Sequence, residues 1–289
     1  MNQPTMQHSG SEKSIGNIIA QVNNLSDAQV QQVLAHQKEH GLKFGEAAVE
    51  LGLAKREDVL WALSQQFHYP YQAEGRQDVS AELVAATNPF DGPAEFFRDI
   101  RSQLIDTIFG TDGQRPAIAI CSPDIGDGKS FLAANLAVAF SQLGGRTLLV
   151  DADMRTPRLH EIFHIDQAGS GLSSILAGRA ETNVIRPVSA LPSLYVLPVG
   201  VVPPNPLELV QRPAFDLLIA ELTQRFDYVI VDTPAVSHGY DARVIAAKCG
   251  AAVVVAKKGV TKVAPLKSLV DGLQKQSLRF GGVIMNSYS

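Results

Sequence analysis

The residues with the most informative chemistry are Lys129 and Ser130, which close the glycine-rich stretch PDIGDGKS at positions 123–130. Gly126 and Gly128 allow the backbone to turn its N–H groups toward an anion. Lys129 would then reach the outer phosphates of a nucleotide, and the Ser130 hydroxyl would hold magnesium. The stretch therefore predicts a phosphate-binding loop with these contact residues: Gly126, Asp127, Gly128, Lys129, Ser130 and Phe131.

The surroundings of this stretch match those of a nucleotide-binding loop. An apolar run at 117–121 predicts a buried strand before it, and the pattern at 131–143 predicts a helix after it. The N-terminus of that helix would add a partial positive charge beside the anion. Pro123 stands where the usual motif has its first glycine, so a plain glycine-rich turn capping a helix is the alternative. Agreement of strand, loop and helix favours the nucleotide site.

Acidic residues follow two further apolar runs. One run ends in Asp151 and Asp153, and the other ends in Asp232. Because the carboxyl ends of strands line the ligand crevice of open α/β sheets, these carboxylates should lie beside the phosphate loop. We expect Asp232 to bind magnesium through water, and Asp151 and Asp153 to provide a second magnesium contact and a base for the incoming hydroxyl or water.

Any one of these acids fits a polar residue that begins a loop. Three acids beside a Lys-Ser loop favour a catalytic site instead. The predicted catalytic residues are Lys129, Asp151, Asp153 and Asp232, and the predicted metal ligands are Ser130, Asp151 and Asp232.

Composition limits the classes of function. The chain has 289 residues and a formal net charge of −4, and its scattered basic residues predict no nucleic-acid binding. Cys121 and Cys249 lie far apart in apolar contexts without metal-ligand spacing, which predicts buried thiols in a reducing compartment. No apolar run approaches the ~20 residues of a membrane helix, and residues 1–13 lack the apolar core of a signal peptide. We therefore expect a cytoplasmic protein that reaches the inner membrane only through a partner.

Apolar runs alternate with helical patterns along most of the chain. The predicted strands lie near 117–121, 147–151, 194–197, 228–232, 251–256 and 282–285. Such alternation is typical of a mostly parallel, doubly wound α/β sheet with helices on both faces. We predict a P-loop domain at 94–289, preceded by a polar linker with glycine and proline at 72–93.

Residues 14–71 predict a small helical module with a weak internal repeat. The aligned pairs, at a spacing of 29 residues, include Gly16 with Gly45 and Asn23 with Gly52. Each copy is predicted to contain a short apolar helix, a turn and an amphipathic helix, the latter at 26–40 in one copy and 55–67 in the other. Ser26 is suited to cap the first of these long helices. The two halves should pack against each other.

Together these motifs resemble those of the bacterial tyrosine kinase family, whose members regulate capsule and exopolysaccharide assembly. The resemblance runs from Ala94 to the C-terminus. Besides the loop and the acidic motifs, it rests on four further motifs: Glu95-x-x-Arg98-x-x-Arg101, GLSSILAG at 171–178, residues 197–209 with PPNP at 203–206, and GVIMN at 282–286. It implies an ATP and magnesium site and transfer of phosphate to tyrosine hydroxyls. It also implies a membrane chain-length determinant, a polysaccharide co-polymerase, as the partner in exopolysaccharide biosynthesis and export. Asn286 resembles the purine-contacting asparagine of related folds, although a strand-end turn residue explains it equally well.

Glu95, Arg98 and Arg101 lie three residues apart, so on a helix they share one broad face. From spacing alone they fit a solvated helix face, the commoner role of exposed charges. In the bacterial tyrosine kinases this pattern drives ring formation. The resemblance therefore implies a homo-oligomer that uses these three side chains.

Two features bear on rival functions. The Min- and Par-type partition ATPases, wider relatives of these kinases, carry a signature lysine where this chain has Asp124. Asp124 and the Glu-Arg-Arg pattern favour a kinase over a partition-type ATPase. The kinases usually end in a tyrosine cluster, whereas Tyr288 is the only tyrosine in residues 286–289. That ending favours an ATP-driven assembly switch with little or no kinase activity, while the acidic residues favour phosphoryl transfer.

The helical module resembles the N-terminal domain of type II secretion and pilus ATPases, some of which bind cyclic di-GMP. Residues 43–45 and 52–53 keep part of the nucleotide-binding pattern, but Ser14 and Asn23 depart from it. We therefore expect a protein-docking module in preference to a cyclic di-GMP site. Its pairing with the kinase domain resembles the chain-length-determinant tyrosine kinases of the EpsG type.

Overall fold

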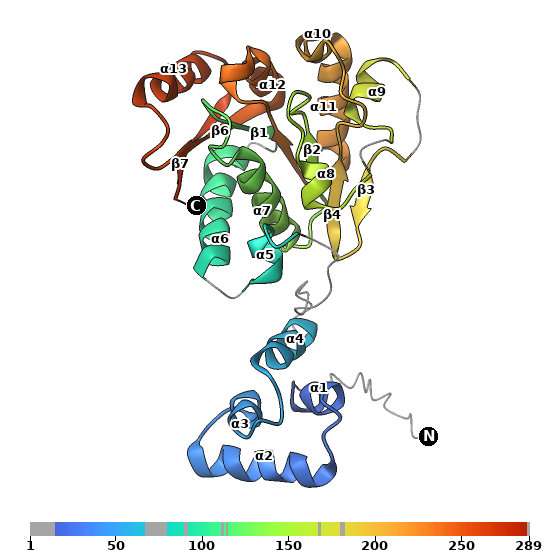
Figure 1. The fold of residues 1–289 in the computed structure, drawn as a ribbon, viewed down its shortest axis with the longest axis vertical. Coiled ribbons are helices and arrows are strands. Elements are labelled where there is room, and N and C mark those ends of the chain that lie inside the picture. The colour runs from blue at the N-terminus through green and yellow to red at the C-terminus, as the bar shows by residue number, and fades with distance from the viewer. Residues whose placement is uncertain are drawn as a thin grey trace, which may run out of the picture. The chain divides into compact units, whose positions relative to one another are not determined.

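The computed structural model describes residues 15–66, 80–89, 92–110, 113, 115–166, 169–179 and 183–287. The chain divides into two compact units, Met1–Arg76 and Gln77–Ser289, whose elements are labelled in Figure 1. Each unit has a hydrophobic core of its own.

In the described part of the first unit, short and long helices alternate. The helices are α1 (Ile15–Val22), α2 (Asp27–His40), α3 (Phe44–Glu50) and α4 (Arg56–Gln66). Helix α1 packs against α3 and α4, and α2 packs against α3. Ile19, Val33 and Ala47 are fully buried among them. The order of a short helix followed by a long one occurs twice, as the repeat predicts.

The turns of the two copies differ by one residue. After α3, Gly52 has a left-handed conformation with φ of 66°, and after α1 the left-handed residue is Asn24, with φ of 49°. Asparagine is one of the few residues besides glycine that adopt this conformation readily. The predicted pairing of Asn23 with Gly52 is therefore wrong by one position, because α1 has 8 residues and α3 has 7.

Side-chain caps begin both long helices. The Ser26 hydroxyl accepts the N–H of Gln29 at 3.3 Å, and the Gln29 side chain accepts the N–H of Ser26 at 2.9 Å. This reciprocal pair is a capping box, which satisfies two N–H groups that the first turn of a helix leaves unpaired. At α4, the Asp58 carboxylate accepts the N–H of Lys55 at 2.8 Å.

Two residues of the partial cyclic di-GMP pattern have structural roles. Gly45 is buried, and a Cβ at this position would lie 2.5 Å from a methyl carbon of Val59. The N–H of Lys43 donates to the Glu46 carboxylate at 2.8 Å at the start of α3. Helix packing and capping therefore account for both residues without a bound nucleotide.

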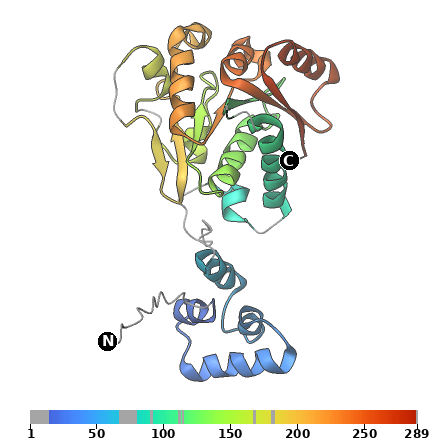
Figure 2. The same ribbon diagram turned by 180° about the vertical axis from the view of Figure 1, so that it is seen from behind.

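The second unit is built on a sheet with strand order β3-β4-β2-β5-β1-β6-β7, seen from opposite sides in Figures 1 and 2. The strands are β1 (Ala117–Cys121), β2 (Thr147–Asp151), β3 (Arg186–Val188), β4 (Leu191–Leu197), β5 (Tyr228–Asp232), β6 (Gly250–Lys257) and β7 (Arg279–Asn286). Every neighbouring pair is parallel except β3 with β4. The predicted α/β P-loop fold with a mostly parallel sheet is confirmed.

The differences from the predicted strands lie toward the two edges of the sheet. At one edge, β7 begins at Arg279 instead of residue 282. The sequence does not predict β3, and it predicts β4 to begin at residue 194 instead of Leu191. Strand β3 has 3 residues and contains Pro187. It is therefore too short to show the alternation of a strand, and proline is confined to edge strands because it donates no ladder hydrogen bond.

Helices cover both faces of the sheet. Ile118 and Ile120 of β1 face one core, which includes residues of α5 (Val84–Thr87), α6 (Gly92–Leu104), α7 (Lys129–Ser141) and α8 (Leu159–Ile162). Ala119 and Cys121 face the other core, which includes residues of α9 (Leu172–Leu176), α10 (Pro206–Gln211), α11 (Pro213–Arg225), α12 (Asp241–Cys249) and α13 (Val263–Gln274). This alternation follows from the two-residue period of a strand. A π-helical turn, η1 (Ile105–Phe109), follows α6, and a 3-10 turn, η2 (Val236–His238), follows β5.

Both cysteines are buried free thiols, as the sequence predicts. Burial disfavours the charged thiolate, which raises the pKa of Cys121 to about 12 and raises that of Cys249 as well. Thiols in such apolar surroundings are unreactive. Cys121 and Cys249 therefore contribute to packing.

The predicted linker, 72–93, ends too late. Residues 83–86 are buried in the core of the second unit, on the side of α6 and α7. The boundary between the units lies at Arg76 and Gln77 instead. The polar composition around this segment conceals a short apolar run, Leu-Val-Ala-Ala, that packs as α5.

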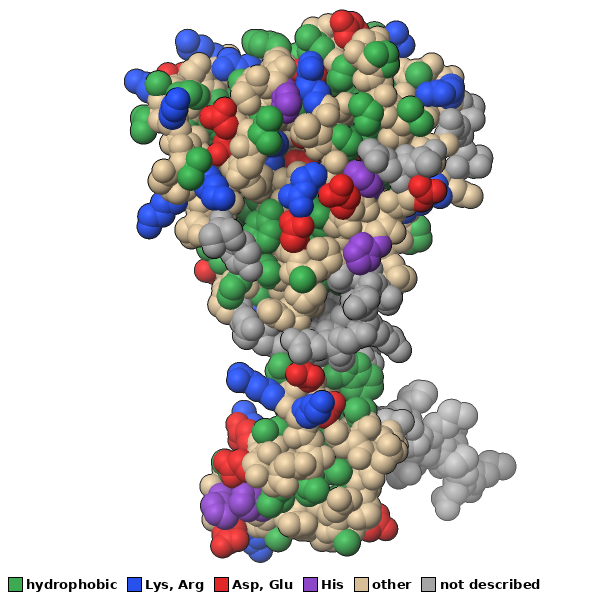
Figure 3. Space-filling model, viewed as in Figure 1, with side chains coloured by type: hydrophobic (Ala, Val, Ile, Leu, Met, Phe, Trp, Pro, Cys, Tyr) green, Lys and Arg blue, Asp and Glu red, His purple; other side chains and the backbone are tan. Residues whose placement is uncertain are grey.

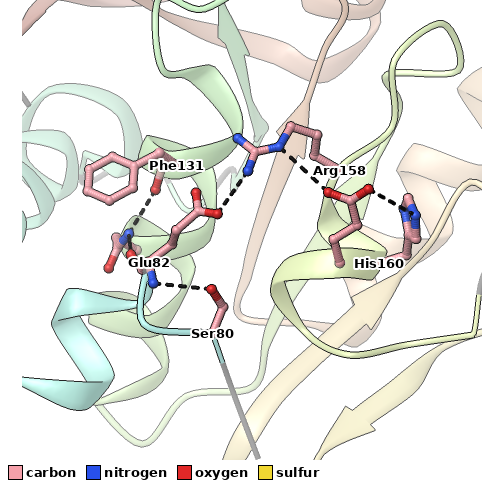
Figure 4. Close-up of polar contacts among 7 residues, drawn as sticks. Ser80, Glu82, Phe131, Arg158 and His160 are labelled. Atoms are coloured by element: carbon pink, nitrogen blue, oxygen red, sulfur yellow. Dashed lines mark hydrogen bonds and ion pairs between the residues drawn. The ribbon is translucent and has the colours of Figure 1, made fainter. Parts of the chain in front are cut away.

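Polar contacts hold the same segment against α7 and α8, and Figure 4 shows those around Glu82. The Asn135 side chain, buried on α7, accepts the N–H of Ala85 at 2.9 Å and donates to the carbonyl of Glu82 at 2.9 Å. The Glu82 carboxylate pairs with Arg158 at 2.8 Å, beside the start of α8. The N–H of Ser80 donates to the carbonyl of Ile162 at 3.2 Å. A deletion of the first unit must therefore stop before residue 80 to leave the second unit intact.

Candidate active site

The glycine-rich stretch forms a loop between β1 and α7, at the carboxyl edge of the sheet. Gly126 and Gly128 have φ values of 82° and 99°, which other residues rarely adopt. Lys129 is the first residue of α7, and it and Ser130 are 6% and 8% exposed. Backbone N–H groups of Val236 and of the residue after it donate to the carbonyls of residues 122 and 123, which fixes the start of the loop.

The sheet brings the three predicted acids to this loop. Strand β5 lies between β1 and β2, and Asp232 is paired in register with Ile120 on one side and Asp151 on the other. Asp151, Asp153 and Asp232 are 0%, 2% and 0% exposed. The charges of Lys129 and Asp153 both shift the pKa of Asp232, which places these groups together. The predicted constellation is thus assembled.

Asp151 and Asp153 also shape the turn that follows β2. Asp151 accepts the N–H groups of Asp153 and Leu159, each at 3.2 Å. Asp153 accepts the N–H of Arg155 at 3.2 Å, and it accepts the N–H and the hydroxyl of Thr156 at 2.9 Å and 3.0 Å. Burial, reinforced by the charges of Asp232 and Asp153, raises the pKa of Asp151 well above its usual range. A carboxylate offers about four lone-pair sites, so both acids keep capacity for a further partner.

Asp232 differs from the other two acids. Neither of its buried carboxylate oxygens accepts a hydrogen bond from the described residues. Burial raises the pKa of Asp232 to about 7. Three groups lie close enough to Asp232 to oppose this rise: Lys129, Ser130 and the N–H of Thr233. None of them donates to the Asp232 carboxylate with hydrogen-bond geometry. A buried, unpaired carboxylate is unfavourable unless a cation or donors compensate it.

Magnesium fits this arrangement. Mg²⁺ keeps several waters and is usually held by one or two carboxylates together with substrate phosphates. Among the residues that the structure describes, no group of three or more His, Cys, Asp or Glu is placed to hold a metal ion by itself. The unpaired oxygens of Asp232 beside Ser130 match a site that water and phosphate complete.

The raised pKa of Asp232 predicts how stability depends on pH without magnesium. In the folded protein Asp232 keeps its proton up to about pH 7, whereas in the unfolded chain it loses the proton near pH 4. The folded state therefore loses stability as pH rises from about 4 to about 7. We expect Asp232→Asn to weaken this dependence, measured as the change in melting temperature between pH 5 and pH 7.5 without metal. Equal slopes for Asp232→Asn and wild type would contradict the assigned pKa, and Asp216→Asn on the surface is the control.

One pair beside the site was not predicted. Arg155 donates to Asp241 through Nε at 3.2 Å and through Nη2 at 3.0 Å, and Asp241 is 1% exposed. This two-pronged contact ties the turn after β2 to the start of α12. The partners are 86 residues apart, so no local pattern reveals them.

Three predicted site residues contact protein atoms. The Phe131 ring packs edge-on against Phe97 of α6, with centroids 5.8 Å apart, so its side chain belongs to the α6–α7 interface. Asn286 donates through Nδ2 to the backbone carbonyl of Asp127 at 3.0 Å. The Asp127 carboxylate accepts the N–H of Asp124 at 2.9 Å. The end of β7 thus contacts the phosphate loop through Asn286 and Asp127.

Glu95, Arg98 and Arg101 lie on one side of α6 but differ in their surroundings. Glu95 is exposed and accepts Arg98 Nη1 at 2.5 Å. Arg98 also donates to the carbonyl of Pro89, and Arg101 donates to the carbonyl of Ala139 on α7 at 2.6 Å. The two arginines therefore bond to backbone within their own chain.

Charged side chains of both signs are interspersed over the face of the second unit drawn in Figure 3.

No helix among the described residues has the length and apolar character needed to cross a membrane.

Comparison with known proteins places this site in a family context. Residues 118–289 match the family model of the CobQ/CobB/MinD/ParA nucleotide-binding domain. The chain is 33% identical over 207 residues to the tyrosine-protein kinase wzc of Salmonella typhimurium, which covers 72% of this chain and 28% of that protein. It is 33% identical over 192 residues to the tyrosine-protein kinase CpsD of Streptococcus agalactiae, which covers 66% of this chain and 82% of that protein. The chain thus spans about a quarter of the Salmonella protein and most of the streptococcal one.

Solved structures agree with the sequence relatives. The chimerical protein CapA2B2 is 32% identical, with a TM-score of 0.67 and coverage of 78% of this chain and 97% of that chain. The septum site-determining protein MinD of Pyrococcus horikoshii, in complex with Mg-ADP, is 25% identical, with a TM-score of 0.54 and coverage of 61% and 72%. From the curated relatives, the family model and the assembled phosphate loop, the chain belongs to the bacterial tyrosine kinase family within the CobQ/CobB/MinD/ParA group of nucleotide-binding domains.

Proposed function

We propose that this chain transfers the γ-phosphoryl group of ATP to tyrosine hydroxyls in a magnesium-dependent reaction. The observation that carries the proposal is the buried Asp232, whose carboxylate has no hydrogen-bond partner among the described residues and lies beside Lys129 and Ser130. Both sequence relatives described above are tyrosine-protein kinases by name, and the MinD relative contains Mg-ADP. An acid beside a phosphate loop is the residue that, with the loop Ser or Thr, holds Mg²⁺ in P-loop nucleotide sites.

The roles of the residues follow from their positions. Backbone N–H groups of the loop and the Lys129 ammonium would hold the β- and γ-phosphates, where negative charge is greatest. Ser130 directly, and Asp232 through water, would hold Mg²⁺, which neutralises phosphate charge when bound. Asp151 would complete the metal environment or, with Asp153, accept the proton of the attacking hydroxyl.

We also propose that the kinase works with a membrane chain-length determinant in exopolysaccharide biosynthesis and export, and stays peripheral to the inner membrane through that partner. The similarity to the chimerical protein CapA2B2 supports association of the kinase with a second polypeptide. The test assays ATP hydrolysis and phosphotyrosine with and without the cytoplasmic tail of the membrane protein encoded next to it. Partner-dependent phosphotyrosine supports the proposal, and equal rates with and without the tail count against it.

We infer that Glu95, Arg98 and Arg101 form part of an assembly surface. A variant of Glu95 tests assembly without disturbing the fold, because Glu95 is exposed. Both arginines, in contrast, donate hydrogen bonds to backbone carbonyls of their own chain. Glu95→Lys should therefore lower the average mass in light scattering under conditions where the wild type associates, with an unchanged circular dichroism spectrum. Asp99→Lys, an exposed position on the same helix, is the matched control. An unchanged mass distribution for Glu95→Lys would show that these three charges form an ordinary solvated helix face.

We propose that the first unit is an adaptor that docks the kinase on the export machinery. Its buried core is small and its helices repeat, which suits a tethered module that raises local concentration. Deleting residues 1–76 should leave ATP affinity within about twofold of wild type and abolish association with the machinery. Full co-purification of the truncated chain would contradict this role. Tight cyclic di-GMP binding that is lost in Lys43→Ala would favour a sensor instead.

A second candidate is an ATP-driven assembly switch with little kinase activity. The observation that favours it is the likeness to the MinD structure described above, which contains Mg-ADP and is not a kinase by name. Tyr288 lies outside the described residues. A partition-type ATPase is less favoured, because Asp124 replaces the signature lysine and its N–H is bonded to Asp127 inside the loop.

A further inference from the structure

The phosphate loop contains an acidic side chain in an unusual role. Asp127 stands between the two glycines of the loop and is 1% exposed. Its Oδ2 accepts the N–H of Asp124 at 2.9 Å, and its Oδ1 accepts the hydroxyl of Thr261 at 2.6 Å. A carboxylate in a loop that binds phosphate is unfavourable unless donors satisfy it. Here both oxygens are occupied by donors of the protein.

Thr261 connects this carboxylate to the next strand of the sheet. It lies in the turn between β6 and α13, and its hydroxyl accepts the N–H of Lys257 at 2.6 Å while donating to Asp127. The N–H of Thr261 donates to the carbonyl of Lys257 at 2.9 Å, so the turn is closed on itself. Thr261 thereby fixes Asp127 to the end of β6, which is the neighbour of β1.

Asn286, the last residue of β7, holds the same part of the loop from one strand further away. Its Nδ2 donates to the backbone carbonyl of Asp127 at 3.0 Å, and its own carbonyl accepts the N–H of Lys258 at 2.9 Å. A Cβ at Gly128 would collide with the Asn286 amide. Gly128 is therefore required for this close approach as well as for its φ of 99°.

We propose that Asp127, Thr261 and Asn286 form a clasp that holds the phosphate loop in its binding conformation before nucleotide arrives. The clasp rests on the proposed nucleotide site, and it assigns Thr261 and Asn286 as positioning residues that act through Asp127. Loop N–H groups bind phosphate well only when they already point to one place, because ordering them on binding consumes affinity. The clasp therefore acts on nucleotide affinity and leaves the chemical step largely unchanged.

The first test compares Thr261→Val with Thr261→Ser in the full chain, using calorimetric titration with MgADP. Valine keeps the shape and removes the hydroxyl, whereas serine keeps the hydroxyl. We expect a Kd about tenfold higher for Thr261→Val, the scale of one hydrogen bond to a charged group, and within about twofold of wild type for Thr261→Ser. Thr223→Val is the matched control, because its hydroxyl bonds to carbonyls on its own helix, such as that of Ile219 at 3.0 Å. An unchanged Kd for Thr261→Val, or an equal loss for Thr261→Ser, overturns the clasp.

A kinetic measurement separates positioning from catalysis. Thr261→Val should raise the KM for ATP by about the same tenfold factor and change kcat by less than about threefold. Asn286→Ala should act in the same direction. The double variant should lose less affinity than the product of the two single losses, because both residues act on Asp127. Independent losses that multiply fully would show that the two residues do not share a clasp.

The last measurement needs no nucleotide and so stands apart from the proposed kinase activity. The N–H of Asp124 is protected by Asp127, and its exchange with deuterium is followed by NMR in the free protein. We expect exchange about tenfold faster in Thr261→Val than in wild type, with unchanged exchange in the core of β1. Equal Asp124 exchange in both proteins overturns the clasp, even where the wild type phosphorylates tyrosine normally.

Discussion

Replacing Lys129 by Met should abolish turnover of ATP and weaken its binding. The side chain lies at the start of α7, is 6% exposed, and carries a positive charge that lowers the pKa of Asp232. Methionine keeps the length of the side chain and the N–H groups of the loop, but it removes the charge that meets the outer phosphates. Loss of one such electrostatic contact lowers kcat by about two to three powers of ten.

Calorimetry with MgATP and a coupled ADP-release assay check this result. Lys275→Met, at the exposed end of α13, is the control and should behave as wild type. Since Lys129 also shifts the pKa of Asp232 downward, its loss should leave Asp232 protonated to higher pH. Unchanged binding and turnover in Lys129→Met would show that the loop is a helix-capping turn.

Asp151→Asn and Asp153→Asn should lower turnover more than they weaken nucleotide binding. A base acts mainly as charge develops in the transition state, so removing it lowers kcat by about two to four powers of ten. The structure adds a stability effect, because Asp151 accepts the N–H of Leu159 and Asp153 accepts the hydroxyl of Thr156. Asp153→Asn should therefore melt at a lower temperature than wild type, whereas Asp151→Asn also removes an unfavourable buried charge and should melt closer to wild type.

Single-turnover kinetics with saturating MgATP separate these effects. Asp216→Asn, on the exposed surface of α11, is the control for charge removal. A rate loss at saturating nucleotide in either variant identifies the acid that acts in the chemical step. Equal and complete loss of binding in both variants would assign Asp151 and Asp153 to the architecture of the turn after β2.

The central strands and the phosphate loop could be predicted because their signals are local. Strands β1, β2 and β5 are continuous apolar runs, and Asp151 and Asp232 stand at their ends, so the rule for carboxyl edges of parallel sheets places them together. The edge strand β3 carries no such signal, since it is short and contains proline. The sequence misplaces the boundary between the linker and the second unit, because the short apolar run that forms α5 lies within polar sequence.

The remaining differences come from contacts between distant residues. Arg155 and Asp241 are 86 residues apart, and Asp127 and Thr261 are 134 apart, so neither pair produces a pattern in the sequence. The sequence predicts Phe131 as a contact residue from its place after the motif, but it does not reveal that the ring packs on Phe97 of α6. Motifs thus predict which residues bind phosphate, whereas the residues that hold those in place emerge only from the fold.

The most direct test of the proposed kinase activity measures two products of one reaction. The full chain is incubated with Mg²⁺, labelled ATP, a tyrosine-containing acceptor peptide and the cytoplasmic tail of its membrane partner, and phosphotyrosine and ADP are measured over time. We predict that phosphotyrosine appears together with ADP in wild type and that neither forms with Lys129→Met. ADP release without phosphotyrosine would contradict the kinase and identify the protein as a nucleotide-driven switch.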